Sequence, residues 1–162
     1  MNIPWKTTIW SQFGAAIDTL DDMLRACPDN VWRERLWDNR LTRPEYAEFW
    51  YRVYHALFWL DLYLTGAEEG FVPPAPFELI EMEEDDLPSR VYTKDELQAY
   101  LEYGRKKCQA TIEALTEEAA QRRCQFCGIT ALQYAACSGD CGTVEPFSRT
   151  KRSFGFRLCS HS

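Results

Sequence analysis

The sequence predicts an all-α protein, a bundle of three long helices followed by a C-terminal segment of different character. Apolar residues recur at three- and four-residue spacing in three stretches before residue 123. Proline, glycine and capping signals bound these stretches. From Cys124 onward the periodicity stops, and five of the seven cysteines occur there. The chain is 46% apolar and 14% aromatic, which is enough to build a core.

The first helix is expected from about Lys6 to Ala26. One apolar stripe runs along it, formed by Ile9, Phe13, Ile17, Leu20 and Leu24. Pro28 and Asp29 end this helix. The next apolar residues predict a loop or short turn that packs on the core: Val31, Trp32, Leu36 and Trp37.

The second helix is expected over residues 44–64. Pro44 stands near its first position and Glu45 lies in its first turn, as is common at a helix start. Its apolar residues lie on nearly all sides: Phe49, Trp50, Val53, Tyr54, Leu57, Phe58, Leu60 and Tyr63. Such a helix is expected in the middle of a bundle, and Gly66 ends it.

A long loop is predicted over residues 66–92, because it contains Pro73, Pro74 and Pro76 and the acidic run from Glu81 to Asp86. The acidic run is interpreted as a solvated connection, and cation binding is the alternative. Thr93 and Glu96 form a capping-box pattern that opens the third helix. The apolar stripe of this helix is Leu97, Leu101, Cys108, Ile112 and Leu115, and its polar face carries Glu102, Arg105, Lys106 and Glu113.

Three long amphipathic helices need a fourth element to close a bundle, and this element is expected just beyond residue 123. The chain instead continues with Cys124, Cys127, Cys137, Cys141 and Cys159. The first four cysteines approximate the spacing of a four-thiolate zinc site, with nearby glycines able to form the turns. A redox CxxC is a second interpretation, but no strand is predicted before it.

A third interpretation is that the tail is out of frame. Read one base later, permitted codons for residues 128–150 spell E-L-L-L-Y-N-M-R-H-V-Q-E-(I/T)-(V/A)-A-Q-L-S-L-F-L-G-Q. This string has no stop and carries apolar residues at helical spacing. Synonymous codons leave the middle base of each shifted codon free, whereas the outer bases are largely fixed. We therefore interpret residues 1–123 as a helical bundle and residues 124–162 as a frameshifted tail that replaces the last helix.

The stretch from Tyr54 to Leu64, Y-H-A-L-F-W-L-D-L-Y-L, places one histidine on an aromatic helix before a leucine-rich run with an aspartate. This stretch resembles the second-helix signature of the DinB-like (YfiT-like) four-helix-bundle proteins. The shifted tail, with Y-N-M-R-H-V-Q-E and A-Q-L, is similar to the last helix of that family. The resemblance covers about residues 5–123 as written, and nearly the whole chain once the tail is shifted.

The resemblance implies a DinB-like four-helix bundle with three intact helices here and a defective C-terminal segment. It also implies a divalent metal, nickel, zinc or iron, held by one histidine of the second helix and two of the last. His55 is the residue that inherits a ligand role by position, since imidazole on an apolar inner face can bind such an ion. Without the resemblance, His55 reads as a buried histidine bonded to a backbone carbonyl. Asp61 is interpreted as structural.

The chain departs from the family pattern in the last helix. Ala136 stands over the first expected tail histidine and Asp140 over the second. A codon for Asp140 cannot yield a histidine in the shifted reading, so the triad stays incomplete there. His161, the other histidine of the chain, lies in the out-of-frame tail.

Two classes of function are therefore expected. The first is a metal-dependent hydrolase or thiol transferase with an incomplete metal site, which would act on a small-molecule substrate or thiol; its catalytic residues are not assigned. The second is a non-catalytic helical bundle, expected as a homodimer, with a decayed site. A zinc-binding cysteine tail is the remaining alternative. The net charge of −7 argues against nucleic acid, and no run of about 20 apolar residues indicates a membrane span. The expected compartment is the cytoplasm.

Overall fold

The computed structural model describes residues 5–38, 43–83 and 86–121. These residues form three long helices, α1 (Trp5–Ala26), α2 (Phe49–Thr65) and α3 (Lys94–Ala114). The short elements are 3-10 helices η1 (Asp29–Val31), η2 (Pro44–Ala47) and η3 (Leu79–Met82), and the single-turn helix α4 (Glu117–Ala120). No extended strand occurs in the described ranges, and one isolated bridge joins Arg35 to Glu48. The predicted all-α class is confirmed for this part of the chain.

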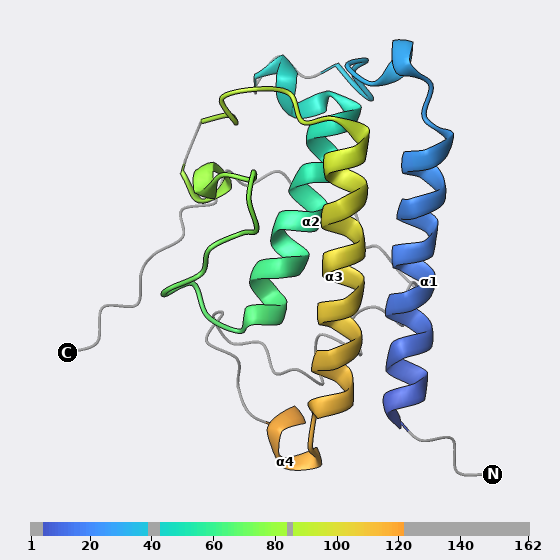
Figure 1. Ribbon diagram of the computed structural model, residues 1–162, viewed down its shortest axis with the longest axis vertical. Helices are drawn as coiled ribbons and strands as arrows, with labels where there is room; N and C mark the ends of the chain where they lie inside the picture. The colour runs from blue at the N-terminus through green and yellow to red at the C-terminus, as the bar shows by residue number, and fades with distance from the viewer. Residues whose placement is uncertain (1–4, 39–42, 84–85, 122–162) are drawn as a thin grey trace, which may run out of the picture.

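The helix in contact with both of the other long helices is α3, which lies between them in Figure 1. Helices α1 and α3 are antiparallel, because Arg105 pairs with Asp18 whereas Lys6 donates to the carbonyl of Glu113. Helices α2 and α3 run in the same direction, as Figure 1 shows. Among the three long helices of the described ranges, α3 therefore lies between the other two, and α2 packs both on α3 and on the residues that follow it.

The parallel course of α2 and α3 explains the long loop between them. Parallel helices need a connection that returns along their length, and residues 66–83 and 86–93 belong to this crossover (Figure 1). Gly66 ends α2 with a positive φ of 84°, a conformation that glycine adopts without strain. The crossover also adds aromatic residues to the core: Phe71, Phe77 and Tyr92 are buried there.

The first helix agrees with its prediction within one residue at its start. Its expected stripe packs on the core, with Ile17 and Leu24 buried and the other members partly buried. The segment after it differs in part. Leu36 is 52% exposed and Trp37 is 43% exposed, so these two side chains are not held in the core as expected. The tertiary contacts of this segment come from its backbone and from Trp32, whose indole packs against the core and donates to the carbonyl of Tyr92.

The backbone contacts also explain why α2 begins later than the sequence predicts. Residues 44–47 form a 3-10 turn, and Glu48 is extended, so the α-helix begins at Phe49 rather than Pro44. The amides of Phe49 and Trp50 donate to the carbonyls of Glu34 and Trp32. These bonds satisfy donors that a helix start leaves free, which a sequence pattern cannot reveal because the acceptors lie elsewhere in the chain.

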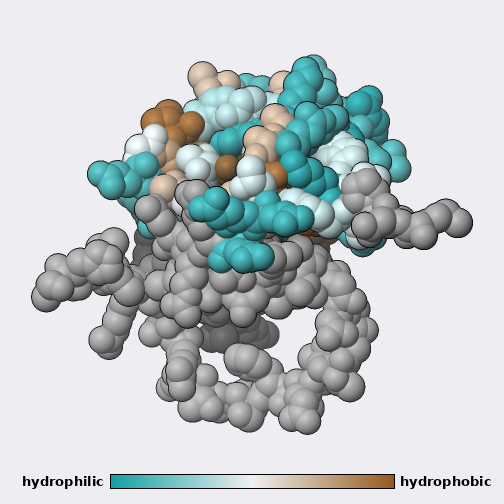
Figure 2. Space-filling model, turned by 90° about the horizontal axis from the view of Figure 1, so that it is seen from below, coloured by the Kyte–Doolittle hydropathy of each residue, from teal (hydrophilic) through white to brown (hydrophobic). Residues whose placement is uncertain are grey.

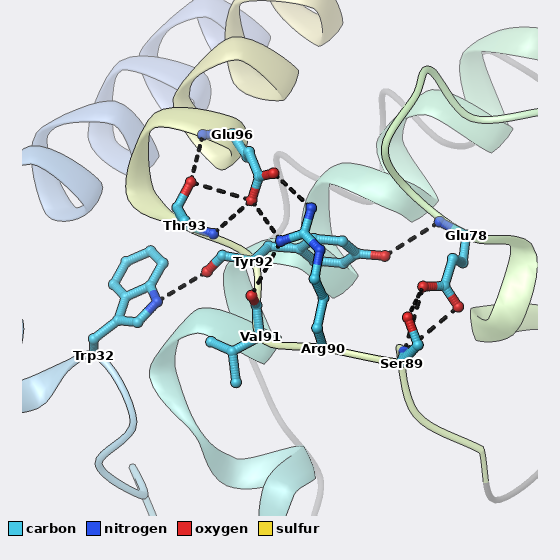
Figure 3. A network of polar contacts seen from close by, with 8 residues as sticks. All are labelled: Trp32, Glu78, Ser89, Arg90, Val91, Tyr92, Thr93 and Glu96. Atoms are coloured by element: carbon cyan, nitrogen blue, oxygen red, sulfur yellow. Dashed lines mark hydrogen bonds and ion pairs between the residues drawn. The ribbon is translucent and has the colours of Figure 1, made fainter.

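Both hydrogen bonds of the predicted capping box are present at the start of α3. The Glu96 amide donates to the Thr93 hydroxyl, and the Thr93 amide donates to the Glu96 carboxylate at 2.8 Å. Arg90 also donates to Glu96 (Figure 3). The Arg90 hydrogen bonds, followed by the Thr93 amide, lower the pKa of Glu96 to about 2. The carboxylate therefore stays ionised well into the acid range.

We expect Thr93→Ala to lower the free energy of unfolding by about 1 kcal/mol, because it removes the acceptor of one amide at the helix start. Thr7→Ala is the matched control, since Thr7 is exposed within α1. Chemical denaturation of both variants measures the difference. Equal stability of the two variants would show that the box contributes nothing.

The outer surface of the described residues is mixed. On the face seen in Figure 2, hydrophilic residues cover most of the described surface, and hydrophobic residues form small separate patches. None of the helices in the described ranges is long and apolar enough to cross a membrane. The expected fourth helix, the five cysteines from Cys124 onward, Ala136, Asp140 and His161 all lie outside the described residues.

Candidate functional site

His55 lies on α2 at the edge of the aromatic core. Tyr51 and Trp59 are one turn away on either side, and both ring centroids are 6.2 Å from the imidazole centroid. The neighbouring Tyr54 and Phe58 are fully buried, whereas the His55 side chain is 34% exposed. The ring thus has one side against packed aromatic groups and part of its surface open.

The partner of this imidazole comes from the crossover. Nδ1 of His55 lies 2.6 Å from Oε2 of Glu81, and Nε1 of Trp59 donates to the same oxygen at 3.2 Å. Glu81 stands in η3, and its side chain is only 3% exposed. The interpretation of the acidic run as wholly solvated is therefore wrong for Glu81, although Glu83 and Asp86 are exposed as expected.

The second carboxylate oxygen of Glu81 is unusual. Oε1 is buried and has no hydrogen-bond partner among the described residues. Tyr51 is the other polar group near this carboxylate: its burial, followed by its interaction with Glu81, raises the pKa of the Tyr51 hydroxyl far above the ordinary value. The site therefore combines a buried acceptor with three neighbours that carry donors, His55, Trp59 and Tyr51.

The arrangement leaves one imidazole nitrogen unused. Nδ1 of His55 is engaged by Glu81, and Nε2 makes no hydrogen bond within the part of the chain that the structure describes. The partner is a carboxylate, so the interpretation of His55 as a histidine bonded to a backbone carbonyl is wrong. A histidine supported in this way through one nitrogen is typical of metal ligation or proton transfer at the other.

A complete metal site is not formed by the described residues. Across residues 5–38, 43–83 and 86–121, no group of three His, Cys, Asp or Glu side chains is placed to hold an ion. Two described cysteines, Cys27 and Cys108, are buried free thiols. Burial raises the pKa of both, that of Cys108 to about 11, so neither forms a thiolate readily. The described residues therefore supply one imidazole ligand, His55, and one carboxylate, Glu81, that is hydrogen-bonded to it.

Asp61 has the structural role expected of it. Its carboxylate is fully buried, accepts the Tyr100 hydroxyl at 3.0 Å and pairs with Nζ of Lys107 at 2.5 Å. Lys107 also donates to the hydroxyl of Thr65. These bonds tie α2 to α3 and use both carboxylate oxygens, so Asp61 is not available as a ligand.

Glu81 is the site residue that the sequence interpretation missed. Its one distinguishing signal is its position between apolar residues, Ile80 and Met82, rather than among the other acids of the run. Comparison with family models, curated proteins and solved structures gives no match to this chain. The DinB-like resemblance and the ligand role of His55 therefore stay predictions, to be judged on the geometry of the site.

Proposed function

We propose that this chain is a DinB-like helical protein, a metal-dependent hydrolase or thiol transferase by descent, whose metal site is incomplete. His55 provides one ligand through Nε2, and Glu81 supports it through Nδ1. A bound nickel, zinc or iron ion would supply Lewis-acid chemistry to a small-molecule substrate or thiol. In this proposal the imidazole of His55 holds the ion, and the aromatic residues beside it limit the access of water to the ion.

The observation that carries the proposal is the hydrogen bond at 2.6 Å between His55 and the buried Glu81. Metal-binding histidines commonly donate their other ring nitrogen to a carboxylate, which fixes the ring and raises the basicity of the ligand. A surface histidine without such a role gains little from a buried acid, because burying a carboxylate is costly.

A non-catalytic bundle, assembled as a homodimer, is the second candidate. It is favoured by the sequence of the tail, where Ala136 and Asp140 stand over the two histidines that the family pattern needs. Under this proposal the pair of His55 and Glu81 is what remains of the site.

Metal content separates the two candidates. We expect a chain carrying the shifted reading over residues 128–150 to retain nickel, zinc or iron in near-stoichiometric amount after dialysis, measured by elemental mass spectrometry. His55→Ala should abolish this retention, because it removes the one imidazole of the described site. Zinc bound through the thiolates of the tail is the separate case, and Cys124→Ser with Cys127→Ser would remove it.

The control is His161→Ala in the same protein with the shifted reading, because residue 161 lies outside residues 128–150. Loss of metal from the His55 variant alone supports the metal-dependent class. A protein in the shifted reading that retains no metal, or retains it equally without His55, rules out that class and leaves the non-catalytic bundle.

A further inference from the structure

Helix η3 shows an inverted pattern of burial. Leu79 is 42% exposed and Met82 is 40% exposed, whereas the side chain of Glu81 between them is 3% exposed. Apolar burial would favour the opposite arrangement, with the leucine and methionine inside and the glutamate in water. Polar contacts must therefore hold Glu81 inward, and they come from His55, Trp59 and the Tyr51 hydroxyl.

The same contacts decide which atom carries the imidazole proton. The indole of Trp59 can only donate, so Oε2 of Glu81 already serves as an acceptor at 3.2 Å. When this group is a carboxylate its oxygens can only accept, and the bond at 2.6 Å is then donated from Nδ1 of His55. In the neutral ring one nitrogen is protonated and the other is not, so Nε2 is left with its lone pair.

We propose that Glu81 is a positioning residue that holds neutral His55 in the Nδ1–H tautomer and so makes Nε2 the reactive nitrogen of the site. The use of that nitrogen for metal binding rests on the proposed function, but the tautomer does not. Glu81 acts through His55 and needs no direct contact with a metal or substrate.

Nitrogen NMR of the ring measures the tautomer directly. The chain has two histidines, so spectra of the metal-free full-length protein at alkaline pH contain two imidazole patterns, and His161→Gln assigns them. We expect wild-type His55 to show a protonated Nδ1 and an unprotonated Nε2. A wild-type ring with its proton on Nε2 would overturn the proposal, and this result does not depend on any variant.

Variants of Glu81 test the cause. Glu81→Leu should release the ring to the Nε2–H tautomer that predominates for histidine in water, because no acceptor remains beside Nδ1. Glu81→Gln should keep Nδ1–H, since Trp59 still requires an oxygen at the shared position. Glu83→Leu, in the same acidic run but exposed, is the control and should leave the tautomer unchanged. A leucine variant that is folded and still shows Nδ1–H would overturn the proposal. If the leucine variant does not fold, Glu81→Asp, whose shorter side chain no longer reaches, replaces it.

Metal affinity connects this result to the proposed function. Loss of a carboxylate that supports a ligating histidine typically weakens metal binding by about 10- to 100-fold, and we expect that loss for Glu81→Leu with nickel or zinc. A protein that shows Nδ1–H but binds no metal through His55 would contradict the proposed function alone. One that binds metal through His55 with equal affinity in the Glu81 and Glu83 variants would contradict the positioning role alone.

Discussion

Replacement of Lys107 by methionine is expected to lower the free energy of unfolding by about 3 kcal/mol or more. Asp61 is fully buried, and Lys107 lies 2.5 Å from its Oδ1 and 3.1 Å from its carbonyl oxygen. Methionine keeps most of the side-chain length but removes the charge and the donors. The carboxylate then stays buried with the Tyr100 hydroxyl as its remaining partner, and an uncompensated buried charge is costly.

The neighbouring lysine gives a matched control for this effect. Lys106 is 75% exposed at its side chain, and its pairing with Glu102 is 3.6 Å long. Exposed pairs of this kind contribute little, so Lys106→Met should change the stability by less than about 0.5 kcal/mol. Chemical denaturation of both variants tests the difference, and a similar cost for the two lysines would show that the Asp61 pair is not a strong interaction.

A double variant separates the charge from the packing. Asp61→Leu combined with Lys107→Met removes both charges and leaves apolar groups in their place. We expect the double variant to be more stable than the sum of the two single changes predicts, because each single change leaves a partner unpaired. Additive costs would mean that the two side chains contribute independently.

The parts of the fold that the sequence predicted are those set by local interactions. The apolar stripe of α1, the capping box of Thr93 and Glu96, and the end of α2 at Gly66 each depend on residues within a turn of one another. The structure of these three features agrees with the prediction because helix propensity, capping and hydrophobic periodicity all act over the same short range.

The differences arise where distant segments meet. Helix α2 begins later than predicted because its first amides donate hydrogen bonds to the carbonyls of Trp32 and Glu34. No sequence pattern around Pro44 indicates those acceptors. The side chains of Leu36 and Trp37 are exposed although their apolar character suggested burial, and in this segment Val31 and Trp32 pack against the core instead. The parallel course of α2 and α3 likewise follows from the crossover and not from either helix alone.

The candidate site divides in the same way. His55 could be placed on a helix from the sequence, since the aromatic period around it is regular. Its partner could not, because Glu81 belongs to an acidic run and lies 26 residues away. A run of charges normally indicates a solvated surface, and only the fold shows which one of its carboxylates faces inward.

Phe77→Ala is expected to lower the free energy of unfolding by about 3–5 kcal/mol, although Phe77 lies in the crossover rather than in a helix. Its ring is stacked on Tyr100 with centroids 4.2 Å apart and lies 4.8 Å from Tyr92. The side chain is 8% exposed, so alanine would leave a cavity between α2, α3 and the crossover. A surface loop would not show such a cost.

Two further substitutions decide whether this cost comes from packing. Phe77→Leu retains apolar volume and should cost less than half as much, whereas Val72→Ala, at a position 73% exposed, should leave the stability within about 0.5 kcal/mol of the wild type. A small loss of stability in Phe77→Ala would mean that the crossover lies on the surface of the bundle and contributes little to the core. A large one means that the crossover belongs to the core, and because η3 lies in that crossover, the packing of Phe77 also helps to set the position of Glu81 against His55.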